Sequence, residues 1–121
     1  MLEFDPSVQI QALRSTFGEI KAVVDVDALT AEIARLSDEA GAPDLWDDVE
    51  KAQKVTSALS HRQSELKRVT EVEQRLDDVE VLVELAQEMD DEESAEEARR
   101  EIVDLEKVIS QLEVQTLLDG E

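Results

Sequence analysis

Apolar positions repeat at helical spacing over most of this chain. In its last part, up to about Leu118, they recur every three or four residues, which predicts a narrow seam on one helix face. The residues of this seam are Ala98, Ile102, Leu105, Ile109 and Leu112. A longer pattern without Gly or Pro runs from Val49 to about Glu88. The acidic stretch Asp90–Glu93 separates the two patterns, so we expect two long helices folded back as an antiparallel hairpin.

A shorter helix is predicted ahead of the hairpin, from about Pro6 to Val24. Asp5 can cap its first turn, and proline suits the first helical position because its missing N–H would be unpaired there. Gly18 lies inside the pattern and weakens the helix by roughly 1 kcal/mol relative to alanine. The apolar stripe consists of Ile10, Leu13, Phe17, Ile20 and Val24.

A second short helix is predicted from about Ala28 to Ala40. Asp25 and Asp27 are its candidate N-caps. Gly41 can end the helix in the left-handed conformation, and Pro43 then prevents its continuation. The apolar stripe consists of Leu29, Ile33, Leu36 and Ala40.

Capping boxes mark the starts of both long helices. In this motif a small polar or acidic cap is followed three residues later by Glu or Gln, and each side chain accepts from the other's backbone N–H. Asp47 with Glu50 fits the first long helix, and Ser94 with Glu97 fits the second. At the other end, Asp119-Gly120 indicates a helix stop.

Together these elements predict an all-α fold, in which two shorter N-terminal helices pack on an antiparallel hairpin of two long helices. We expect both short helices on the N-terminal half of the first long helix. Trp46 is expected to be buried at the corner, contributing about 2–3 kcal/mol. Three Gly and two Pro leave little chain for the turns of a β fold. We expect residues 1–121 to form a single helical domain.

The net charge of −20 is concentrated at the two ends of the sequence. Residues 1–50 carry three Lys or Arg against twelve Asp or Glu, and residues 89–121 carry the same numbers. Binding to phosphates needs clustered cations, so bare nucleic acid and anionic membranes are disfavoured as partners. Basic proteins, or a basic patch on a larger assembly, are the expected partners.

The acidic stretch Asp90, Asp91, Glu92 and Glu93 is the candidate interaction surface. A calcium loop of the EF-hand kind needs a central glycine and alternating oxygen ligands, and this stretch has neither. Two interpretations remain open. The stretch is either a solvated hairpin turn or a docking point for a basic partner surface.

One concentration of basic residues interrupts the acidic chain, with Glu65 as the single acid between positions 51 and 68. It lacks the interleaved aromatic residues on which nucleic-acid bases stack. We expect it either to pair with the acidic helices of the same chain or to contact acidic protein or RNA in a large assembly. Its members are Lys51, Lys54, Arg62, Lys67 and Arg68.

No arrangement of residues predicts an enzyme. His61, the only histidine, has Ser57, Ser64 and Glu65 at helical spacing, but one helix face cannot build a catalytic triad with an oxyanion site. We therefore expect a solvent-facing or interface histidine. There is no phosphate loop, nucleophile elbow or metal-ligand cluster. We expect no catalytic residue, no cofactor and no metal.

The N-terminal sequence predicts no export. Residues 1–6 contain neither a basic nor an apolar signal region, and no apolar run approaches the ~18 residues that span a bilayer. The chain contains no cysteine, which fits a reducing compartment. We expect a cytoplasmic protein without a membrane partner.

The order of several segments resembles bacterial peptide chain release factor 2, a family of class I release factors. The resemblance covers essentially all 121 residues, and the tryptophan segment together with the acidic turn makes it fairly specific. The segments are Phe4-Asp5-Pro6, Pro43-Asp44-Leu45-Trp46-Asp47, Glu50-Lys51-Ala52-Gln53, Leu82-Val83-Glu84-Leu85-Ala86 ahead of the acidic turn, Leu112-Glu113 and Gly120-Glu121.

This resemblance implies the N-terminal domain of a factor that recognises UAA and UGA stop codons on the ribosome and triggers hydrolysis of peptidyl-tRNA. The family's Ser-Pro-Phe codon-recognition and Gly-Gly-Gln hydrolysis motifs do not occur here. The resemblance therefore implies a non-catalytic arm that contacts the stalk base of the large ribosomal subunit, near the class II release factor. The alternative is a helical coiled-coil adaptor or dimerisation module, whose seam would pair between chains.

Overall fold

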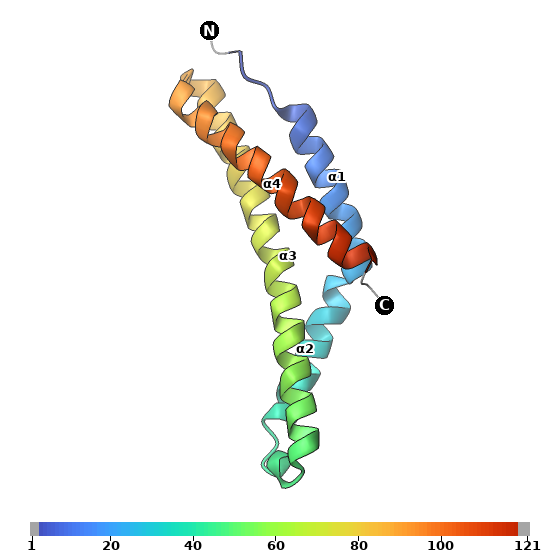
Figure 1. Ribbon diagram of the computed structural model, residues 1–121. Coiled ribbons are helices and arrows are strands. Elements are labelled where there is room, and N and C mark those ends of the chain that lie inside the picture. The colour runs from blue at the N-terminus through green and yellow to red at the C-terminus, as the bar shows by residue number, and fades with distance from the viewer. Residues whose placement is uncertain (1–2, 119–121) are drawn as a thin grey trace. The chain divides into compact units, whose positions relative to one another are not determined.

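The computed structural model describes residues 3–118 and confirms the all-α fold over that range (Figure 1). The two long helices are packed antiparallel, and two shorter helices accompany them. The elements are α1 (Ser7–Val24), α2 (Val26–Ala40), the short 3-10 helix η1 (Leu45–Asp47), α3 (Val49–Met89) and α4 (Glu92–Leu118).

The described residues form two compact units. The first contains the residues up to Val23 together with those from Glu71 onward, and the second contains Val24–Thr70. The C-terminal part of α3 therefore belongs to the first unit and its N-terminal part to the second. The turn of the hairpin, α4 and the part of α3 from Glu71 onward lie in the first unit.

The apolar seam of α4 is buried in the first unit, as the spacing predicts. Its five residues are between 0 and 6% exposed. The C-terminal part of α3 buries a matching series with the same alternation of three and four residues: Val72, Leu76, Val79, Val83 and Ala86. Leu76 and Leu105 are completely buried, and each contributes about 1.5–3 kcal/mol by leaving water.

The expectation that α1 packs on the N-terminal half of α3 is wrong. The first four residues of its apolar stripe are buried within the first unit, with Phe17 and Ile20 at 2% and 0% exposure. The flanking cations of α1 reach carboxylates one helical turn apart on the C-terminal part of α3. The cross-helix bonds run from Lys21 Nζ to Glu73 Oε2 (2.8 Å), from Arg14 Nη2 to Asp77 Oδ1 (2.6 Å) and from Gln87 Nε2 to the Phe4 carbonyl oxygen (2.9 Å).

In the second unit, α2, η1 and the start of α3 share a small core. It is formed by Leu36, Leu45, Ala52 and Val55. Trp46 is not part of it: 58% of this residue is exposed, so the prediction of a buried corner tryptophan is wrong. The single turn of η1 directs one of its three residues inward, and that residue is Leu45.

The helix ends differ from the predicted motifs in two places. Asp48, not the pair Asp47 and Glu50, caps α3, because Asp48 Oδ1 accepts from the backbone N–H of Lys51 (3.2 Å). Gly41 ends α2 with φ −89°, so it is not left-handed as expected. Its N–H closes the helix on the carbonyl oxygens of the preceding turn, which needs no special backbone conformation.

The predicted cap of α2 is confirmed at Asp25. Its Oδ1 accepts from the backbone N–H of Ala28 (3.2 Å), and its own φ is 54°. At α1, the carboxylate of Asp5 accepts from the backbone N–H of Ser7 (3.1 Å). The pKa of Asp5 is lowered mainly by the Ser7 side chain and further by this backbone hydrogen bond. The helix stop expected at Asp119-Gly120 lies outside the described residues.

Candidate interaction surface at the α3–α4 turn

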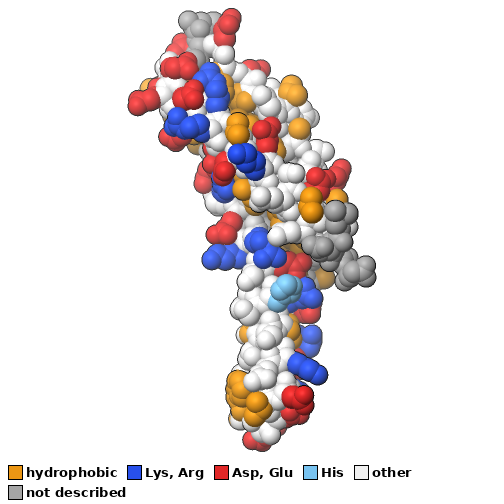
Figure 2. Space-filling view, in the orientation of Figure 1, with side chains coloured by type: hydrophobic (Ala, Val, Ile, Leu, Met, Phe, Trp, Pro, Cys, Tyr) orange, Lys and Arg blue, Asp and Glu red, His pale blue; other side chains and the backbone are white. Residues whose placement is uncertain are grey.

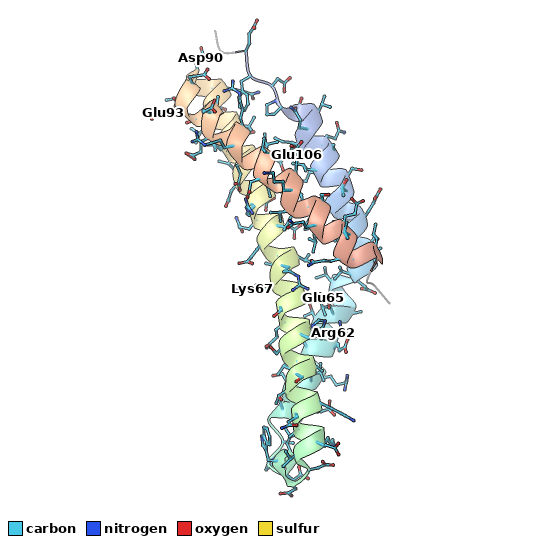
Figure 3. All side chains as sticks on the ribbon, in the orientation of Figure 1. Arg62, Glu65, Lys67, Asp90, Glu93 and Glu106 are labelled. Carbon is cyan, nitrogen blue, oxygen red and sulfur yellow. The ribbon has the colours of Figure 1, made fainter. Side chains whose placement is uncertain are left out.

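The acidic stretch forms the closed end of the hairpin, where the chain reverses within two residues (Figure 3). α3 ends at Met89, and Asp90 takes the left-handed conformation with φ 50°. The N–H of Asp91 then donates to the carbonyl oxygen of Ala86 (3.0 Å). This is the long hydrogen bond of a Schellman helix ending, in which the left-handed residue is usually glycine or asparagine.

Asp91 caps α4, which corrects the predicted box of Ser94 with Glu97. Asp91 Oδ1 accepts from the backbone N–H of Glu93 (3.1 Å), and Oδ2 accepts from the Ser94 hydroxyl (2.8 Å). The Ser94 hydrogen bond is the main reason why the pKa of Asp91 is lowered. The carboxylate also lies at the positive end of the helix dipole. One of the four acidic residues is therefore engaged in ending one helix and starting the next.

Glu92 is engaged in a second local network, centred on Arg99. Arg99 Nη1 donates to Glu92 (2.9 Å) and to Glu96 (3.1 Å). These carboxylates, Glu92 first, raise the pKa of Arg99. The guanidinium also lies 5.0 Å from the centre of the Phe4 ring, at cation–π distance. The network thus attaches the segment ahead of α1 to the first turns of α4.

The other two acidic residues, Asp90 and Glu93, lie exposed at the end of the hairpin (Figure 3). Within residues 3–118, no hydrogen bond or ion pair is found for the Glu93 side chain. Five further acidic residues lie within four positions of Glu93 in the sequence, and no Lys or Arg precedes Arg99 on α4. The turn therefore presents negative charge to the solvent and suits contact with a cationic surface.

One of the five residues of the basic concentration on α3 pairs within the chain, which is the first of the two expectations. Arg62 approaches Glu32 of α2 (3.6 Å) and bonds Glu65 (2.7 Å), so it pairs within the chain (Figure 3). The other four residues are exposed and form no ion pair with any residue that the structure describes: Lys51, Lys54, Lys67 and Arg68.

His61 has the exposed position expected of a solvent-facing or interface histidine. His61 and Ser64 are exposed on α3, and Glu65 is paired with Arg62. Across the described part of the chain, no group of three or more His, Cys, Asp or Glu side chains could hold a metal ion. None of the helices described has the length and apolar character that crossing a membrane requires.

The apolar spacing does not reveal the cation that bridges the two long helices, Arg75. Arg75 donates to both carboxylate oxygens of Glu101 (2.9 Å each) and to Asp104 (2.5 Å), across the hairpin. Glu101 is the main cause of its raised pKa. Pairing across the hairpin depends on how the two helices are aligned, which the spacing within either helix does not show. The sequence could have indicated this pair only through the turn, because positions equally far from the turn on the two helices lie approximately opposite each other.

Fold and surface together define a helical-hairpin module with a negatively charged closed end. Among known protein families, the model of the PCRF domain matches residues 29–121. The chain belongs to the PCRF domain family.

Peptide chain release factor 2 proteins of several bacteria are similar along the whole chain. The protein of Pseudarthrobacter chlorophenolicus is 53% identical over 121 residues, which is 100% of this chain and 33% of the relative. That of Beutenbergia cavernae is 53% identical over 117 residues, 97% of this chain and 31% of the relative. That of Streptomyces avermitilis is 46% identical over 121 residues, 100% of this chain and 33% of the relative. The chain thus spans about a third of the length of these relatives.

Proposed function

We propose that this chain is the N-terminal domain of a peptide chain release factor 2, acting in translation termination at UAA and UGA stop codons. The similarity to release factors along the entire chain carries this proposal. Residues 1–121 would serve as one helical domain of a longer cytoplasmic factor. This domain is non-catalytic in the proposal, because it contains neither the Gly-Gly-Gln nor the Ser-Pro-Phe motif.

In this proposal the domain is an acidic arm that contacts the stalk base of the large ribosomal subunit, near the class II release factor. Asp90 and Glu93 would form the contact, with Asp91 and Glu92 holding the turn in shape. Exposed charges in water contribute little energy individually and are screened by salt. The isolated chain should therefore bind ribosomes weakly and compete little with an intact factor.

A chimaera tests the proposed function directly. The chain replaces the matching third of the Pseudarthrobacter chlorophenolicus relative, and peptide release is measured on ribosomes programmed with UAA or UGA. We expect the chimaera to release peptide with an apparent affinity for ribosomes close to that of the intact relative. A chimaera no better than the relative lacking this third would contradict the proposal.

The acidic turn is tested in the same chimaera with the double variant Asp90→Asn and Glu93→Gln. Asparagine tolerates the left-handed conformation at position 90, so the turn should keep its structure. We expect the half-saturating ribosome concentration to rise about threefold, with the maximal release rate unchanged, as for weak exposed charges.

The matched control is Glu84→Gln with Glu106→Gln, which removes two exposed carboxylates from α3 and α4 outside the turn. Glu106 lies along α4, away from the turn (Figure 3). It should bind like the unaltered chimaera. Equal weakening by both pairs, or tight salt-insensitive binding by the isolated chain, would show that the turn is not the contact.

A further inference from the structure

The second unit carries an exposed apolar surface at the junction of η1 and α3. Trp46 and Val49 are 58% and 55% exposed, although the adjacent Leu45 is buried. Figure 2 shows hydrophobic side chains gathered at this end of the unit. Single exposed apolar residues are ordinary, but an exposed indole and an exposed valine three positions apart, close in sequence to the residues that line a hollow, are typical of a contact surface.

A hollow of about 330 Å³ lies next to Leu45, and Ala42, Leu45 and Lys51 line it together with four carboxylates: Glu39, Asp44, Asp47 and Asp48. Glu39 is paired with Arg35, and Asp48 caps α3. The side chains of Asp44 and Asp47 form no hydrogen bond or ion pair with the residues that the structure describes. Two carboxylates without such a partner therefore lie on either side of Trp46 in the sequence.

We propose that Trp46, Val49, Asp44 and Asp47, here called the Trp46 surface, bind a protein segment in which a large apolar side chain is adjacent to lysine or arginine. The apolar side chain would cover Val49 and the indole. The cation would approach Asp44 and Asp47, since the hollow that they line contains four carboxylates and one lysine, Lys51.

Charge selects this occupant over the alternatives. Phosphates of a nucleic acid would meet Asp44 and Asp47, whereas a basic segment is attracted by them. Aromatic residues that pack into apolar contacts with a charged rim commonly dominate binding energy at interfaces. The Trp46 surface belongs to the second unit and the acidic turn to the first, so this proposal does not rest on the proposed function.

The test uses the 121-residue chain and a fluorescein-labelled ten-residue peptide of alternating lysine and leucine. Binding is followed by fluorescence anisotropy, and emission of Trp46, the only tryptophan, reports directly on the surface. We expect a blue shift of the Trp46 emission on binding. Trp46→Ala should weaken binding about tenfold, and Asp44→Asn with Asp47→Asn about threefold. A peptide with serine in place of leucine should bind at least tenfold more weakly.

Three controls make the proposal falsifiable. Glu84→Gln with Glu106→Gln removes the same charge from the first unit and should leave binding unchanged, while circular dichroism verifies that each variant is folded. Equal weakening by this pair, or no effect of Trp46→Ala, would reduce the binding to general charge attraction and overturn the proposal.

Two further outcomes would assign the Trp46 surface to another occupant. If oligouridylate shifts the Trp46 emission more than the peptide does, the Trp46 surface binds nucleic acid. A concentration-dependent shift without peptide would make it a self-association surface.

Discussion

At the scale of single residues, Leu45 and Trp46 are neighbours with opposite environments. Leu45 is 5% exposed in the core of the second unit and Trp46 is 58% exposed. We expect Leu45→Ala to lower the free energy of unfolding by about 2–4 kcal/mol, since it leaves a cavity. Trp46→Ala should change it by less than about 0.5 kcal/mol. Urea unfolding followed by circular dichroism measures both changes. A loss of about 2 kcal/mol or more for Trp46→Ala would mean that Trp46 is buried, as the sequence predicts.

Arg75 is the residue whose charge connects the two long helices. Its side chain is a third exposed, and the guanidinium makes a two-pronged contact with Glu101 and a further contact with Asp104. Such geometry is stronger than an ordinary surface pair. We expect Arg75→Ala to lower the free energy of unfolding by about 1 kcal/mol, discounted for screening by solvent.

Arg100→Ala is the matched control for Arg75→Ala in urea unfolding. Arg100 is an exposed arginine of α4 that forms no ion pair within the described residues. Its replacement should be neutral within about 0.3 kcal/mol. The loss caused by Arg75→Ala should shrink at high salt. Equal losses in the two variants would mean that the cross-helix contacts of Arg75 add nothing.

At the scale of elements, the start of α4 depends on the ionised carboxylate of Asp91. Hydrogen bonds from Ser94 and from the backbone lower its pKa below the usual 3.8, because they favour the charged form. A lowered pKa in the folded state means stabilisation that is complete above pH 3.8 and lost as the pH falls through the lowered pKa. Asp91→Ala should therefore reduce the thermal midpoint at pH 7, and the reduction should diminish in acid.

Glu97→Ala separates the observed cap from the box predicted by the sequence. Glu97 is exposed, and no hydrogen bond of its side chain is found in the described part of the chain. Thermal unfolding at several pH values should show the same pH dependence for this variant and the unaltered chain. If Glu97→Ala reproduces the effect of Asp91→Ala, the capping box of Ser94 with Glu97 would be correct after all.

At the scale of the whole molecule, apolar spacing was sufficient to predict the helices and the α4 seam. The five seam residues from Ala98 to Leu112 recur every three or four positions, which places them on one helix face, and this face is buried. The position of α1 was not predictable in this way. It depends on ion pairs that Arg14 and Lys21 form with carboxylates of α3, and the spacing of residues within one helix does not predict pairs between helices.

The position of the acidic turn could be predicted from the sequence, whereas the contacts of its four residues could not. Four consecutive acids identified the turn, yet their composition did not reveal that Asp91 would be the cap and Glu92 the partner of Arg99. The sequence favours Ser94 as the cap because Ser94 and Glu97 fit the capping-box motif. Asp91 prevails because it directly follows the left-handed Asp90, where its carboxylate faces the free N–H groups of α4.

The seam of α4 also bears on whether the chain is a dimerisation module. Leu105 is 0% exposed within one chain, so pairing of this seam between chains would require the hairpin to open. We expect sedimentation equilibrium to give the 13.6 kDa monomer. Leu105→Asp should lose more than about 3 kcal/mol of stability and unfold, since it buries an unpaired charge.

Val103→Asp is the matched control on the opposite face of α4, where Val103 is 53% exposed. This variant should keep its helical circular dichroism and its monomeric mass, because the new charge remains in water. The opposite pattern would be a dimer that Leu105→Asp converts into a folded, helical monomer. That result would place the seam between chains, and the hairpin would then be a dimerisation element rather than an arm complete within one chain.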